Sequence, residues 1–152
     1  MSAGTPTFSS AAAQTLGAAY EHVIPRDGDR DLAFKGWRLS QVKDCQEYTT
    51  GLKQCTEVSI YMTEGEAIVT HVRQWRERQA KTEDEKHRVA VHSPQARDPG
   101  GFLLGRDGAV DEAVEWLKKD NDGELGTLSK KAWIEACRMC PPLKGHDVER
   151  VG

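Results

Sequence analysis

The stretch that decides the fold is EVSIYMTEGEAIVTHVRQWR, residues 57–76. Apolar and other side chains alternate over 57–63 and again over 67–76, with the two-residue period of a strand that has one face on the core. Glu64–Gly65 lies between them and is typical of a turn, so the stretch predicts an antiparallel β-hairpin. The residues on the inward face of its two strands are Val58, Ile60, Met62, Ile68, Thr70 and Val72.

The register of this hairpin follows from its inward face. Joining the two inward faces brings Glu57 opposite or diagonal to Arg73 and brings Tyr61 near Val69. An ion pair and an aromatic residue against a β-branched one are both favourable across antiparallel strands. The apolar pattern and the cross-strand chemistry therefore indicate the same pairing.

Two more strands are expected, one on each side of the hairpin. Leu32–Val42 is rich in apolar and aromatic residues, and Gly36 interrupts it in the way that is typical of a bulge or a close backbone contact. His87–His92 alternates through two valines. The charged residues 76–86 are expected to form a solvated connection before this last strand.

Two helices are predicted after the strands, from apolar residues at i, i+3, i+4 and i+7. The first has acidic residues in its first turn and lysines in its last, as the helix dipole favours. The second begins after Thr127 or Ser129 as N-cap and ends at Pro141–Pro142. The two apolar stripes consist of Val110, Ala113, Val114 and Leu117, and of Trp133, Ala136, Cys137 and Cys140.

The order of strands before helices indicates an α+β fold. We expect an antiparallel β-meander of about four strands, followed by two C-terminal helices packed on one face. Residues 31–142 are predicted to form a single α+β domain, with a flexible or partly helical leader at 1–30 and a frayed tail at 143–152. In the leader, the apolar residues of 16–24 have the spacing of a short helix.

The composition limits the partners and the compartment. A net charge of −3 and a pI near 6.0 leave no overall positive field to attract nucleic acid or an anionic membrane. No apolar run approaches the roughly 18 to 20 residues of a membrane helix, and the N-terminal residues do not have the pattern of a secretory signal. Four cysteines without a dense framework favour reduced thiols. We therefore expect a soluble cytoplasmic protein.

The cysteines offer one possible zinc site. Cys137 and Cys140 form a CxxC pair, and Cys45 and Cys55 would complete four thiolates for a tetrahedral ion. Zinc pairs normally lie on tight turns, whereas this CxxC pair lies on the apolar stripe of a helix. Buried structural cysteines are the simpler interpretation.

The segment 120–129 resembles an EF-hand calcium loop, and with its flanking helices the resemblance covers about thirty residues. A calcium loop requires a turn glycine at its sixth position, where Leu125 stands, and a bidentate carboxylate at its twelfth, which falls on Lys131 or the next residue. A helix-to-helix turn explains the same residues, and no cofactor is expected. The candidate ligands are Asp120, Asp122 and Glu124.

The outward face of the hairpin is the leading candidate for a binding surface. An exposed tryptophan beside arginine and tyrosine is typical of the anchor of a protein interface. The same aromatic and basic groups are also able to stack on bases and meet phosphates, so single-stranded nucleic acid is an alternative partner. The candidate binding residues are Tyr61, His71, Arg73, Trp75 and Arg76.

The chain contains no nucleophile elbow, phosphate-binding loop, HExxH or kinase spacing. His71, His87 and His92 are expected on neighbouring strands, but histidines in strands are more often surface residues than a catalytic cluster. We therefore expect a small non-enzymatic binding or regulatory protein with a protein partner. Nucleic-acid binding and metal binding, through the cysteines or the degenerate calcium loop, are the alternatives, and the oligomeric state stays open.

Overall fold

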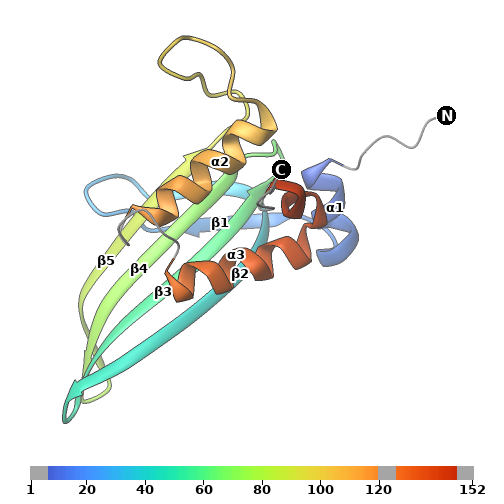
Figure 1. Ribbon diagram of the computed structural model, residues 1–152. Coiled ribbons are helices and arrows are strands. Elements are labelled where there is room, and N and C mark those ends of the chain that lie inside the picture. The colour runs from blue at the N-terminus through green and yellow to red at the C-terminus, as the bar shows by residue number, and fades with distance from the viewer. Residues whose placement is uncertain (1–6, 120–125, 147–152) are drawn as a thin grey trace, which may run out of the picture.

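The computed structural model describes residues 7–119 and 126–146 and contains one antiparallel sheet with helices (Figure 1). The strands follow the order β1-β2-β3-β4-β5, so each strand pairs with its neighbours in the chain. The α+β prediction is confirmed, with five strands rather than about four. The elements are α1 (Phe8–Leu16), β1 (Tyr20–Ile24), β2 (Leu32–Thr49), β3 (Leu52–Thr63), β4 (Ile68–Arg78), β5 (Lys81–His92), α2 (Gly105–Lys118), α3 (Thr127–Met139) and a 3-10 helix (Pro141–His146).

The central β3–β4 hairpin has the predicted register. Glu57 lies opposite Arg73 and Tyr61 lies opposite Val69. The turn is closed by the backbone N–H of Thr63, which donates to the carbonyl of Ala67 at 2.9 Å. The inward face and the turn chemistry were therefore sufficient to fix this part of the sheet.

The expected solvated connection at 76–86 is wrong, because β4 and β5 continue through it. Only Gln79 and Ala80 separate the two strands, with φ angles of 50° and 64°, as in a two-residue turn of a twisted hairpin. Charged residues occupy both faces at this end of the sheet, so the sequence shows no alternation there. The pairing is supported by ion pairs of Arg76 with Asp84 and of Arg78 with Glu83.

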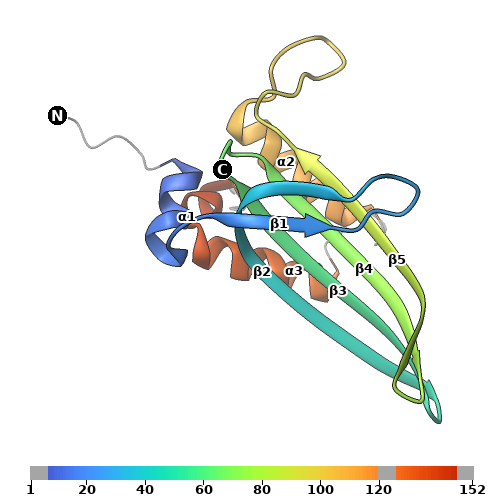
Figure 2. The same ribbon diagram turned by 180° about the vertical axis from the view of Figure 1, so that it is seen from behind.

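Strand β2 bends, and its bend gives the molecule its shape. The pairing of β2 with β3 shifts between Arg38 and Ser40, and the first part of β2 pairs instead with β1. A Cβ atom at Gly36 would lie 2.1 Å from the carbonyl oxygen of Met62, which confirms the predicted close contact. The β1–β2 hairpin consequently lies across the face of the sheet opposite α2 and α3 (Figure 2).

The N-terminal segment contains two elements of the fold. The helix expected over 16–24 is wrong: α1 lies before it, and Tyr20–Ile24 is a strand paired with β2. Phe8 of α1 is fully buried, and its carbonyl accepts a hydrogen bond from Cys140 Sγ at 3.5 Å. Leu143, in the predicted tail, is fully buried as well.

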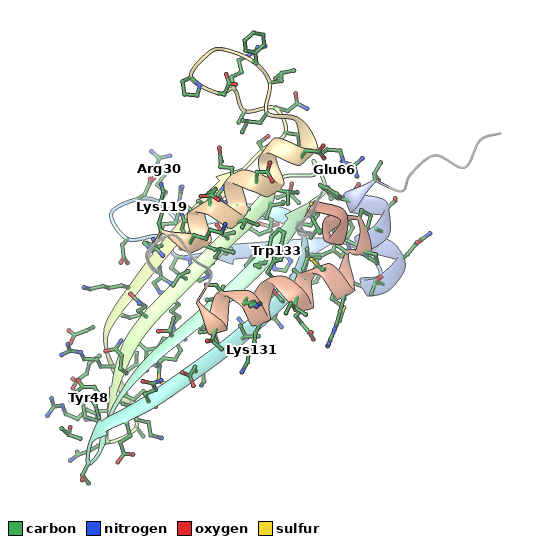
Figure 3. All side chains as sticks on the ribbon, viewed as in Figure 1. Arg30, Tyr48, Glu66, Lys119, Lys131 and Trp133 are labelled. Carbon is green, nitrogen blue, oxygen red and sulfur yellow. A yellow bond between two sulfur atoms is a disulfide. The ribbon has the colours of Figure 1, made fainter. Side chains whose placement is uncertain are left out.

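The main core lies between the sheet and the three helices. The predicted stripes of α2 and α3 are buried at Ala113 and Leu117 and at Trp133 and Ala136. Trp133 lies on the side of α3 that faces the sheet (Figure 3). Helix α3 begins after Gly126, rather than after a threonine or serine cap. None of the helices in the described residues is long and apolar enough to cross a membrane.

A second, smaller core lies on the opposite face of the sheet, beneath the β1–β2 hairpin. Ile24 packs there with Tyr61 and Val69, and partly buried apolar residues of β2 and β5 surround them. The loop between β1 and β2 also reaches β5, where Asp27 Oδ2 accepts from the backbone N–H of His87 at 2.9 Å. The β1–β2 hairpin thus covers one half of this face and leaves the half near the β4–β5 turn uncovered.

Candidate functional site

The predicted binding residues do not form one exposed face. Tyr61, His71 and Trp75 are only 7%, 7% and 3% exposed, so the expected exposure of the tryptophan is wrong although it lies on the predicted face. Tyr61 belongs to the second core under the β1–β2 hairpin. Arg76 is exposed and, one residue after Trp75, points to the other face of β4. The alternation of residues along the hairpin identified its two faces correctly, but it did not show that other segments of the chain cover them.

What the structure does bring together on this face is a polar cluster of His71, Arg73, Glu85 and His87. His71 Nε2 lies 2.9 Å from His87 Nδ1, and the two rings stack with centroids 5.1 Å apart. His87 Nε2 also lies within hydrogen-bond distance of Glu85 Oε1. Arg73 Nη2 donates to the second oxygen of Glu85 at 3.0 Å. The cluster therefore links β4 to β5 through an unbroken chain of hydrogen bonds.

The electrostatics of this cluster define its protonation. Burial, with additional effects of His87 and Arg73, lowers the pKa of His71 to about 4. Arg73, through its hydrogen bond, holds the pKa of Glu85 below its ordinary value. With Glu85 ionised, His87 Nε2–H donates to Glu85, and His71 Nε2 and His87 Nδ1 share one hydrogen bond. The lowered pKa of His71 keeps its ring neutral at pH 7.

Trp75 is covered by cations rather than free for stacking. The guanidinium carbon of Arg73 lies 4.1 Å from the ring centroid, and Lys43 Nζ lies 5.7 Å from it. The indole N–H donates to Glu77 Oε1 at 3.1 Å. A ring that is 3% exposed offers no platform to a nucleobase, so this conformation gives no support to the nucleic-acid alternative.

His92 lies apart from the other two strand histidines, on the helix-covered face. Its Nε2 is 2.8 Å from the Thr70 hydroxyl, and its Nδ1 is 2.9 Å from Glu112 Oε1. A hydroxyl, an imidazole and a carboxylate in this order resemble a hydrolytic triad, but Thr70 is fully buried and no substrate can reach its oxygen. Because Glu112 belongs to α2, the three residues tie that helix to β4 and β5.

The four cysteines do not meet at one metal ion. Cys45 and Cys55 lie opposite each other on β2 and β3 and form a disulfide with a Cα–Cα distance of 4.1 Å. Cys137 and Cys140 are not part of a disulfide and are buried in the main core, on the other side of the sheet. The expectation of reduced thiols therefore holds for this pair alone, and the four-cysteine zinc site is wrong.

The other two parts of the metal prediction, the CxxC pair and the calcium loop, receive no support from the structure. Burial raises the pKa of Cys140 to about 12, so its thiol stays protonated and is a poor ligand and nucleophile. The candidate calcium ligands Asp120, Asp122 and Glu124 lie outside the described residues.

The most exposed large apolar side chain among the described residues is that of Phe102, which belongs to the loop between β5 and α2. Residues 93–104 join β5 to α2 and project from one end of the molecule (Figures 1 and 2). Phe102 and Leu103 are 74% and 55% exposed near the tip of this loop. Asp98 accepts from the N–H of Phe102 with its side chain at 3.0 Å and from the N–H of Gly101 with its carbonyl at 2.9 Å.

Further hydrogen bonds hold the base of the 93–104 loop. The backbone N–H of Leu104 donates to the carbonyl of Ala96 at 2.8 Å, and Arg97 Nη1 donates to the carbonyl of Gly101 at 2.6 Å. A bridge between Arg97 and Leu103 pairs the two arms. The loop is thus a small ordered unit that presents apolar side chains. The signal in the sequence was an apolar pair within a segment of prolines and glycines, where water-facing residues are expected.

Comparison of the chain with protein-family models, with curated proteins and with solved structures finds no match.

Proposed function

We propose that this chain is a small non-enzymatic binding or regulatory protein that contacts another protein through the tip of the 93–104 loop. The observation that carries the proposal is the exposure of Phe102 and Leu103 on a loop that is ordered by its own hydrogen bonds. Large apolar side chains are the usual anchors of protein interfaces, and phenylalanine is enriched among them. The proposal moves the contact surface from the hairpin face to this loop.

The order of the loop favours binding for an energetic reason. A flexible loop loses backbone conformational entropy when it docks, at roughly 1 to 2 kcal/mol for each residue whose backbone becomes fixed. The hydrogen bonds of Asp98 and Arg97 already fix the backbone around Phe102 in the free protein. Binding of a partner therefore does not have to order the loop backbone, and this part of the entropy cost is absent.

The charges of the loop favour a protein over a lipid surface or nucleic acid. Arg97 and Asp98 are adjacent and of opposite sign, and both are engaged in holding the loop. No excess of positive charge surrounds the tip, and the whole chain carries a net charge of −3. The matching partner is a protein with an apolar pocket that accepts the Phe102 and Leu103 side chains. We retain the cytoplasm as the proposed location.

The test combines site-specific cross-linking with paired variants. A photoreactive phenylalanine analogue at position 102, in the full chain within its source cells, is expected to capture one reproducible protein. The control is the same analogue at Tyr48, which is 53% exposed and lies far from the loop, near the β2–β3 turn (Figure 3). Phe102→Ser with Leu103→Ser is then expected to weaken binding of the captured protein by at least about 30-fold, or about 2 kcal/mol.

Two outcomes would oppose the proposal. Equal capture at positions 48 and 102 would show non-specific contact, and unchanged affinity of the Phe102→Ser, Leu103→Ser protein would remove the loop from the interface. The variant Arg73→Ala separates this proposal from the hairpin face that the sequence favoured. It is expected to bind the captured protein as tightly as the natural chain.

A further inference from the structure

Three metal-ligating residues meet on adjacent strands at the uncovered half of the sheet, independently of the 93–104 loop. Cys45 of β2 lies opposite Cys55 of β3, and Glu77 of β4 projects from the same face. The two sulfur atoms and a carboxylate oxygen of Glu77 all lie within 4.8 Å of one another. Cys45 and Glu77 are half-buried and Cys55 is buried, so the group is partly enclosed but reachable.

The distances suit a thiophilic divalent cation once the disulfide is open. Two thiolates on a tetrahedral zinc ion with Zn–S bonds of about 2.3 Å lie about 3.8 Å apart. Small side-chain rotations achieve this separation from directly opposed positions whose Cα atoms are 4.1 Å apart. Glu77 supplies a third ligand, and water completes the four.

Trp75 gives the carboxylate an outer partner. Its indole N–H donates to Glu77 Oε1 at 3.1 Å, which fixes the orientation of the carboxyl group and leaves Oε2 for an ion. Hydrogen-bonded ligands of this kind are typical of protein metal sites, where the outer donor sets ligand geometry. The arrangement exists in the oxidised chain, before any ion binds.

The local charges also favour a cation in the reduced chain. Two thiolates and the Glu77 carboxylate would together carry three negative charges within a few ångströms, and this repulsion is relieved by a divalent ion. Lys53 lies opposite Glu77 in the β3–β4 register and Lys43 lies near the Trp75 ring, so the remaining charge is offset. A metal-free dithiolate is therefore unfavourable beside Glu77, and the reduced cysteines stay protonated as thiols until an ion displaces their protons.

We propose that Cys45, Cys55 and Glu77 form a zinc site that exists only when the Cys45–Cys55 disulfide is reduced. A cellular dithiol transfers two electrons and two protons to the disulfide and itself becomes a disulfide. The ion then displaces the two thiol protons and binds both sulfurs and Glu77 Oε2. Oxidation by a cellular disulfide reverses the sequence: the two sulfurs bond to each other, the ion leaves, and the two electrons, with two protons from water, reduce that cellular disulfide to a dithiol. The redox state of the β2–β3 hairpin thus decides whether metal binds.

The experiment uses the full chain, reduced with a phosphine under anaerobic conditions and titrated with Co²⁺ as the spectroscopic probe. We expect one equivalent of Co²⁺ to give sulfur-to-cobalt charge-transfer absorption with the visible bands of a tetrahedral ion, and Zn²⁺ to displace it. The oxidised chain is expected to give no such absorption. Absence of the bands in the reduced natural chain overturns the proposal.

Two variants and a control identify the ligands. Cys45→Ser is expected to abolish the charge-transfer band, and Glu77→Gln to weaken Co²⁺ binding at least about 10-fold while it keeps a hydrogen-bond acceptor for Trp75. Glu77→Gln retains both thiols, so it remains informative if Cys45→Ser fails to fold. Cys140→Ala, in the main core, is expected to leave the titration unchanged. A band that survives Cys45→Ser, is unaffected by Glu77→Gln or depends on Cys140 assigns the ion elsewhere and overturns the proposal.

Discussion

Acidification should destabilise this protein through His71, and the size of the effect follows from its burial. The pKa of His71 is about 4 in the folded chain, against about 6.5 in an unfolded one. The unfolded state therefore binds the proton first as the pH falls. The contribution of neutral His71 to the free energy of unfolding is fully present above pH 6.5 and is lost progressively between about pH 6.5 and 4.

The linkage relation gives the magnitude. For pKa values of 6.5 and about 4, the free energy of unfolding falls by about 2 kcal/mol at pH 5 and by about 3 kcal/mol at pH 4, relative to neutral pH. The assay is urea unfolding followed by tryptophan fluorescence at constant ionic strength, for the natural chain and for His71→Gln. The glutamine cannot be protonated. Between neutral pH and pH 5 the free energy of unfolding of the variant should therefore fall by about 2 kcal/mol less than that of the natural chain.

The neutral-pH measurement separates this effect from lost contacts. Any decrease in the free energy of unfolding that His71→Gln causes at pH 7.5 comes from the missing hydrogen bond to His87 and the changed packing. The dependence of that free energy on pH comes from protonation of His71. Identical slopes for the two proteins would refute the reasoning. His92, whose pKa burial also lowers, adds its own acid sensitivity to both proteins alike.

Three further predictions concern stability. Trp75→Ala should cost about 3 to 5 kcal/mol because the ring is buried, whereas exposed Tyr48→Ala should change stability by less than about 0.5 kcal/mol; equal urea midpoints would contradict this. Ala80→Gly should stabilise the chain by about 1 kcal/mol because residue 80 has a φ of 64°, and a lower melting temperature would argue against that turn. Reduction of Cys45–Cys55, with a sequence separation of 10, should lower the unfolding free energy by about 2 to 3 kcal/mol in denaturant titrations; an unchanged value would mean that the bond adds no constraint.

Local pattern predicted the parts of the fold in which one face is apolar. The β3–β4 hairpin, its register and the two helical stripes each follow a period that burial imposes on neighbouring residues. The far ends of the strands lack that period because both of their faces are polar, as at 81–86, so they looked like a connection. The β1 strand was mistaken for a helix because its five residues are too few to separate the two periods.

The candidate site depended on contacts between distant segments and was therefore harder to predict. Trp75 is a plausible anchor in the sequence, but in the fold Arg73 and Lys43 lie over its ring and the residue is buried. Tyr61 is covered because β2 bends near residue 39 and returns β1 across the sheet. Neither the cover over Trp75 nor the bend of β2 produces a periodic pattern in the sequence. Phe102 was not among the predicted binding residues, and only the loop geometry shows that it is held outward.

The contact between Phe8 and Cys140 limits the order in which parts of the chain can fold during synthesis on the ribosome. The two residues are 132 positions apart, so α1 is synthesised long before the helix on which it docks. The β-meander pairs neighbours in sequence and is able to form while synthesis continues, whereas Phe8 stays without its final cover until α3 emerges. Helix α1 thus completes its packing only when α3 emerges, and a nascent chain stalled before α3 would expose α1 to chaperones.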